Sequence, residues 1–103
     1  MIITTTENIP EKNYEILGMV KGGMVQTKNI AKDFGQGLKS IVGGELKSYG
    51  IMMDEARATA THRMVQEAEK LNADAIVCTR YGSSMIAAGA AEILAYGTAV
   101  KFV

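Results

Sequence analysis

Two arginines stand where the sequence pattern predicts apolar surface, and they carry the most specific chemistry in this chain. Arg57 falls on the apolar arc of a helical pattern, and Arg80 ends the apolar face of a strand pattern. A guanidinium group presents a planar fork of donors that suits a carboxylate or a phosphate. One hypothesis is that one or both arginines bind a small anion in a pocket between subunits. Tyr49 and Thr98 would then supply neutral hydrogen bonds.

The competing hypothesis is structural, because buried charge is costly unless it is paired. Glu45, Glu67 and Glu92 are the carboxylates that could pair with these arginines, within one chain or between subunits. On residue types alone, this ion-pair interpretation is preferred to ligand binding.

Thiol and imidazole chemistry is scarce, since Cys78 is the only cysteine and His62 the only histidine. A structural zinc site needs about four such ligands, so the sequence predicts no metal site within one chain. No acid can be set beside the two residues to complete a nucleophilic triad. We therefore expect no cofactor, and an enzyme is the least favoured class of function.

Seven methionines could in principle bind a soft metal ion. The pattern instead predicts core packing for most of them. Met52, Met53 and Met64 fall on the core arc of a helix, whereas Met19 and Met24 fall in strands. Core packing is the preferred interpretation.

Length and composition limit the classes of protein. With 103 residues the chain is one domain, residues 1–103, and a modest core makes oligomerisation a natural supplement. Eleven basic and eleven acidic residues balance, which argues against a nucleic-acid partner.

A single cysteine and an N-terminus without a signal-peptide pattern predict a cytoplasmic protein. The stretch from Tyr81 to Val100 carries only one charge, but glycine and serine interrupt it, so we expect buried strands rather than a membrane span.

The longest predicted element is an amphipathic helix that begins near Ser48 and runs to Leu71. Its core arc is rich in alanine, which lets a neighbouring element approach closely. A second, narrower apolar stripe runs through Ile51, Ala58 and Val65. This stripe either faces a helix of another subunit or is simply exposed, and the sequence leaves both open.

The other elements follow from shorter patterns. Strands are expected at Ile2 to Thr5, Tyr14 to Val20 with a continuation over Met24 to Thr27, Ala75 to Tyr81 and Ala91 to Val103. A weak helix is expected from about Asn29 to Val42, ended by Gly43-Gly44, and a loop over Gly82 to Gly89. The order β-β-α-α-β-β predicts an α+β domain with a largely antiparallel sheet. The small face of the last strand should pack on the alanine-rich helix.

A set of short stretches is spread over the chain. They are Gly43-Gly44-Glu45-Leu46, Tyr49, Glu55-Ala56-Arg57, Ala73-Asp74-Ala75-Ile76-Val77, Arg80-Tyr81, and the run from Glu92 to Val100 that ends Ala-Tyr-Gly-Thr-Ala-Val. Together they resemble the YbjQ-type family of small bacterial and archaeal proteins, which carries a provisional heavy-metal-binding label. The resemblance implies a dodecin-like α+β subunit assembled into a ring, usually a homopentamer, and it implies no established function. The residues do not support the heavy-metal label, because the sequence contains no Cys-x-x-Cys and no histidine cluster.

Two classes of function therefore remain ahead of the others. The first is a ring-shaped protein that binds a small molecule or ion, such as a small anion, where subunits meet. The alternative is a structural or interaction module without a ligand of its own, and a second alternative is the heavy-metal binding of the family label.

Overall fold

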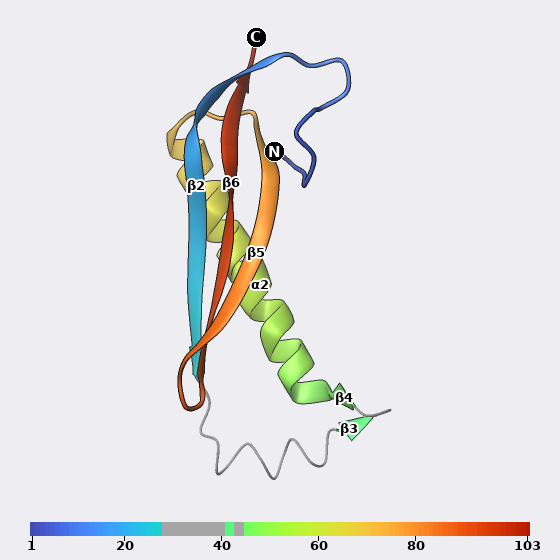
Figure 1. The fold of residues 1–103 in the computed structure, drawn as a ribbon, viewed down its shortest axis with the longest axis vertical. Helices are drawn as coiled ribbons and strands as arrows, with labels where there is room; N and C mark the ends of the chain where they lie inside the picture. Colours follow the sequence, from blue (N-terminus) through green and yellow to red (C-terminus); the bar gives the residue numbers. More distant parts are fainter. Residues whose placement is uncertain (28–40, 43–44) are drawn as a thin grey trace.

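The computed structural model of the protein describes residues 1–27, 41–42 and 45–103, with side chains outside residues 41–48. A long helix crosses one face of a four-stranded sheet, as Figure 1 shows. The elements are β1 (Ile2–Ile3), β2 (Tyr14–Thr27), β3 (Ile41–Val42), β4 (Glu45–Leu46), α2 (Lys47–Lys70), β5 (Ala75–Ala87) and β6 (Ala90–Phe102). The predicted α+β class is confirmed.

The sheet has the strand order β1-β5-β6-β2. Its three long strands are antiparallel neighbours, and only the short β1 runs parallel to β5. The loop predicted over Gly82 to Gly89 is wrong, because β5 continues to Ala87 before a short turn leads into β6. Pairing with β6, for example Gly82 with Leu94, holds this segment extended despite its glycine and serine residues.

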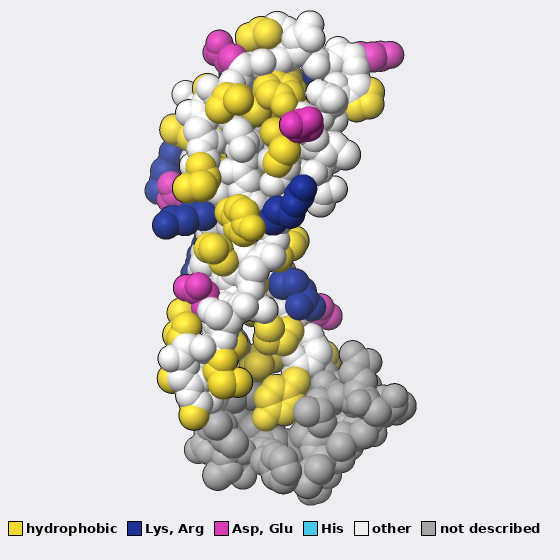
Figure 2. Space-filling view, viewed as in Figure 1, with side chains coloured by type: hydrophobic (Ala, Val, Ile, Leu, Met, Phe, Trp, Pro, Cys, Tyr) yellow, Lys and Arg dark blue, Asp and Glu magenta, His cyan; other side chains and the backbone are white. Residues whose placement is uncertain are grey.

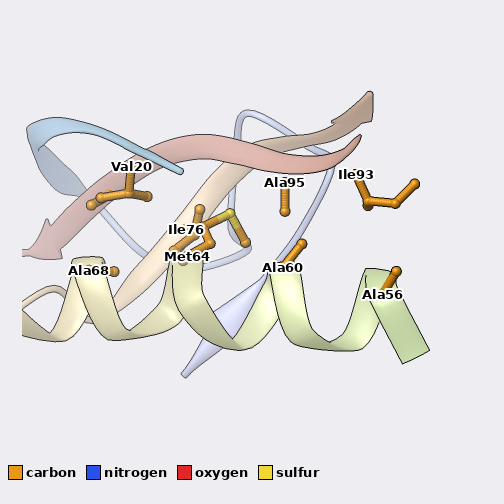
Figure 3. Close-up of a cluster of buried hydrophobic side chains, with 9 residues drawn as sticks. Val20, Ala56, Ala60, Met64, Ala68, Ile76, Ile93 and Ala95 are labelled. Atoms are coloured by element: carbon orange, nitrogen blue, oxygen red, sulfur yellow. The ribbon is translucent and has the colours of Figure 1, made fainter. Parts of the chain in front are cut away.

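The main core lies between α2 and the sheet (Figure 3). Its fully buried helix residues are Ala56, Ala60, Met64 and Ala68, and the strands contribute Val20, Ile76, Ile93, Ala95 and Ala99. The prediction that the small face of the last strand packs on the alanine-rich helix is confirmed. Helix and sheet approach so closely that a Cβ at Gly22 of β2 would overlap the backbone of Ala60 and Met64.

A β-bulge at Cys78 changes which side chains face the helix. Cys78 has a φ of 55°, and the pairing of β5 with β6 shifts register between Val77 and Arg80. The sequence pattern placed Ile76, Cys78 and Arg80 on one face. That prediction is wrong, because the extra residue of a bulge reverses the alternation beyond it. Ile76 packs on the helix side, whereas Val77 and Cys78 both belong to a second cluster on the opposite side.

The second cluster lies on the sheet face away from α2, which we call the outer face. Buried Ala75, Val77 and Val100 are covered there by Ile9 and Phe102. The N-terminal segment therefore protects the upper part of the outer face. Further along β2 and β6 on this face, the side chains are more open.

The weak helix expected from Asn29 to Val42 falls largely on residues 28–40, which lie outside the described residues. Its predicted end is wrong, since Ile41–Val42 is strand β3 and pairs antiparallel with β4. The branched side chains of Ile41 and Val42 favour an extended backbone, and a paired strand satisfies it. The helix α2 begins at Lys47, one residue before the predicted start at Ser48.

Candidate functional site

The two candidate arginines lie on opposite sides of the sheet. Arg57 projects from α2 and forms an ion pair with Asp54, one helical turn earlier. Its side chain is exposed rather than buried, so its predicted place among the core residues is wrong. A long side chain at the border of an apolar arc can carry its charge out to water. Arg57 also lines a cavity of about 120 Å³ beside Tyr81.

Arg80 lies on the outer face, where two backbone carbonyls hold its guanidinium group. Its Nη1 donates to the carbonyl oxygen of Thr79 at 2.9 Å and to that of Thr5 at 3.1 Å. These bonds tie the N-terminal segment to β5. They also orient the planar group, whose charge the carbonyls solvate without neutralising it.

Pairing across the sheet sets Arg80 in a row with two further residues. Tyr96 of β6 is the partner of Arg80 on one side and of Lys21 on the other. Directly paired residues share a face of the sheet, so a tyrosine lies between two cations on the outer face. Figure 2 shows basic side chains on both sides of hydrophobic ones at mid-height of this face. Tyr96 remains 39% exposed.

Of the four candidate ligand residues, the structure brings Arg80 and Thr98 together on the outer face. Thr98 is two residues beyond Tyr96 on the same strand and pairs with Met19. Arg57 and Tyr49 belong to the helix on the other side. The four residues therefore cannot form one site within a single chain. Lys21 and Tyr96, which were not predicted from the sequence, lie in a row with Arg80 instead.

The carboxylates expected as ion-pair partners lie elsewhere. Glu67 pairs with Lys70 at 3.2 Å on the surface of α2. Glu92 lies on β6 opposite Val25, and the side chain of Glu45 is outside the described residues. Among the described side chains, the ion pairs are Arg57 with Asp54, Lys70 with Glu67, and Lys101 with Asp74. Neither arginine pairs with Glu67 or Glu92.

A groove follows the free edge of β2. Two cavities of about 580 Å³ and 590 Å³ lie there, and both are lined by Lys21, Glu67 and Lys70. Arg63 of α2 reaches across the edge, and its Nη1 donates to the carbonyl oxygen of Gly23 at 2.6 Å. The groove is therefore polar and mixed in charge, and it flanks the one long edge of the sheet that runs beside the helix.

Titratable groups of the kind that bind metals do not cluster in the described part of the chain. No three His, Cys, Asp or Glu side chains gather there in a way that could hold an ion. Cys78 is half-buried, with its Sγ 3.9 Å from the carbonyl oxygen of Thr6, and His62 is exposed. No described helix is both long and apolar enough to cross a membrane.

Asp74 accepts a backbone hydrogen bond, and its role is structural. The backbone N–H of Phe102 donates to it at 2.8 Å and lowers its pKa, with a smaller lowering from Lys101. The bond joins the start of β5 to the end of β6. Asp74 therefore fixes the fold near the C-terminus and lies apart from Arg80.

Comparison with known proteins matches the whole chain to one family. A family model described as "Putative heavy-metal-binding" covers residues 1–103. A UPF0145 protein of Clostridium novyi is 54% identical over 101 residues, covering 98% of each chain. UPF0145 proteins of Methanosarcina acetivorans and Thermotoga maritima are each 55% identical over 102 residues, covering 98% of this chain and 96% of theirs.

A solved structure has the same fold. The crystal structure of a protein of unknown function from the DUF74 family of Pediococcus pentosaceus superposes with a TM-score of 0.75. The match covers 100% of this chain and 98% of the other, at 18% sequence identity. At that identity the likeness establishes the α+β fold alone.

Proposed function

Because the chain belongs to the YbjQ family, we propose that it assembles into a ring of identical subunits and binds a small anion where the subunits meet. We infer a dodecin-like subunit, a helix laid across a largely antiparallel sheet, a homopentamer as the assembly, and the cytoplasm as its location. The open edges of the sheet support the assembly, and the position of Arg80 supports an anion as the ligand.

The observation that supports assembly is that the sheet has long open edges. In the described part of the chain β2 pairs only with β6, and β5 beyond Arg80 also pairs only with β6. Exposed apolar side chains follow both edges. They are Ile16, Met19 and Val25 on β2, and Tyr81, Met85 and Ile86 on β5. Long apolar edges tend to pair with another chain, so each edge is a natural place for a second subunit.

The shape of the subunit supports the same conclusion. Its radius of gyration is 16.9 Å, whereas a compact chain of about 100 residues has roughly 13 Å. Its extents are 54 × 26 × 16 Å. Such an elongated chain buries little of its own surface, and association supplies the missing burial.

The position of the cations supports an anion as the ligand. Lys21 lies on β2 at one edge of the sheet, and Arg80 lies on β5 toward the other edge. Edge-to-edge assembly would carry Lys21 of one subunit toward Arg80 of the next. Two cations brought together repel each other, and a phosphate or carboxylate between them would relieve that repulsion. Tyr96 and Thr98 offer hydroxyl groups on the same face.

Native mass spectrometry of gently purified protein tests both parts, because it counts subunits and retained small molecules together. A closed ring that carries anions, or that takes up added phosphate, is the expected result. A mass of 11 kDa at micromolar concentration would exclude the ring. A ring that neither retains nor takes up an anion would favour the alternative, a structural module without a ligand. The second alternative, heavy-metal binding, rests on a different part of the molecule.

A further inference from the structure

Three methionine side chains line one cavity at the end of the sheet where β5 turns into β6. Met52 and Met53 come from the first half of α2, and Met85 comes from β5. The cavity has a volume of about 220 Å³. Its other walls are Gln26, Tyr49, Gly89, Ala90 and Ala91.

Met53 packs against the main core, as the sequence interpretation expects, whereas Met52 and Met85 are not among the described residues that pack there. Met64 is fully buried, as expected for a core residue. Met52 and Met53 are only half-buried, and Met85 is 79% exposed. Met85 therefore contributes little to packing within one chain. Its side chain lines the same cavity as those of Met52 and Met53.

The donor set of this cavity selects a particular kind of ion. Thioether sulfur is a soft, neutral donor that suits Cu⁺, whereas Zn²⁺ takes thiolate, imidazole or carboxylate ligands. Apolar walls also disfavour an ion that keeps its water or carries two charges. A soft monovalent ion brings one charge and sheds its water readily. The residues therefore fit a soft metal and do not fit a hard one.

This donor set also fits the description of the family. The described His, Cys, Asp and Glu side chains form no group that could hold a heavy metal. Thioethers are the remaining soft donors in the chain, and three of them meet at one cavity.

We propose that Met52, Met53 and Met85 bind a soft monovalent metal ion, Cu⁺ or Ag⁺, through their thioether sulfurs. This site is separate from Arg80 and the anion, and it is contained within one chain. Its test measures metal binding and does not depend on Arg80 or on the anion.

Silver titration of the full chain tests the proposal, because Ag⁺ is redox-stable and stands in for Cu⁺. All proteins carry Cys78→Ser, which removes the one competing thiol. Methyl resonances of ¹³C-labelled methionine report each thioether separately. We expect the resonances of Met52, Met53 and Met85 to shift together and saturate at one Ag⁺ per chain, while Met64 and Met19 stay unchanged.

A matched pair of variants completes the test. Met85→Leu and Met19→Leu each replace a highly exposed strand methionine, 79% and 76% exposed, by an apolar side chain of similar size. Met85→Leu should weaken Ag⁺ binding by about tenfold or more, and Met19→Leu should leave it unchanged. Equal binding by the two variants would overturn the proposal. So would equal shifts at Met19 and Met85, or tighter binding of Zn²⁺ than of Ag⁺.

Discussion

The hydroxyl oxygen of Tyr81 on β5 lies 2.7 Å from that of Thr61 on α2. Thr61 already donates its single proton to the carbonyl oxygen of Arg57 at 2.8 Å, so Tyr81 must be the donor of the pair. Tyr81 faces the helix only because the bulge at Cys78 shifts the alternation of β5. The same shift turns Arg80 to the outer face, so one backbone irregularity positions both side chains.

Removing this bond should weaken the attachment of β5 to the helix. Tyr81→Phe keeps the ring and loses the donor, and we expect a loss of about 0.5–1 kcal/mol in the free energy of unfolding, because the pair is partly exposed. Urea denaturation of Tyr81→Phe, Thr61→Val and the double variant measures it. The two single changes should be non-additive by a similar amount. Strict additivity would show that the hydroxyls do not interact.

Among the described glycines, Gly22 should tolerate a side chain least. Gly22→Ala would drive a Cβ into the backbone of Ala60 and Met64, which cannot move without displacing the helix. We expect it to cost about 3 kcal/mol or more, or to prevent folding. Gly23→Ala is the matched control, since its nearest atom, the carbonyl oxygen of Ile93, would be 4.0 Å away. Thermal unfolding of both variants checks the prediction, and similar melting temperatures would contradict it.

Local patterns were enough to predict the core but not the site. The buried arc from Ala56 to Ala68 follows from helical periodicity, which depends on residues within one element. The bulge at Cys78 could not be predicted, since a positive φ at cysteine has no signature in the residue types. The extension of β5 through Gly82 depends on its pairing with β6, which is a tertiary effect. The row of Lys21, Tyr96 and Arg80 depends on the bulge and on the strand pairing. It can therefore be recognised only once the register of the sheet is known.

Asp74 should make the free energy of unfolding depend on pH. The N–H of Phe102 lowers the pKa of Asp74 in the folded state below its ordinary value of 3.8. The folded state therefore favours the carboxylate, and the resulting stability is present above that ordinary value and lost as the pH falls through the lowered pKa. Asp74→Asn should flatten the decline of stability between about pH 5 and pH 2. Denaturation at several pH values measures it, and unchanged pH profiles would contradict the assignment.

The second apolar stripe of α2 should matter for assembly rather than for the fold. Ile51 is 52% exposed and Ala58 is exposed, whereas Val65 packs against the core. Ile51→Glu therefore probes an interface more cleanly than a charge at Val65. We expect smaller assemblies by light scattering with unchanged circular dichroism, because an interface charge loses water without gaining a partner. Unaltered assembly would show that this stripe faces solvent.

The two arginines should respond differently to the same substitution. Arg80→Met removes the charge from the outer face and keeps much of the apolar stem, whereas Arg57→Met removes an exposed ion pair on the other side of the sheet. An exposed pair contributes about 0–1 kcal/mol, so Arg57→Met should fold, assemble and bind phosphate as the parent does. Arg80→Met should lose its bonds to Thr5 and Thr79 at a cost of about 1–2 kcal/mol and still fold.

Phosphate affinity then separates the two interpretations of Arg80. If it binds an anion, Arg80→Met should weaken phosphate binding by about tenfold or more, an effect best measured by calorimetry at low ionic strength. Lys21→Met should weaken it in the same direction, because Lys21 lies in the same row across Tyr96. If Arg80 serves only to hold the N-terminal segment, Arg80→Met will lower the stability of the fold. Its phosphate affinity will then equal that of Arg57→Met and of the parent. That result would remove the anion from the proposed function and leave the assembly.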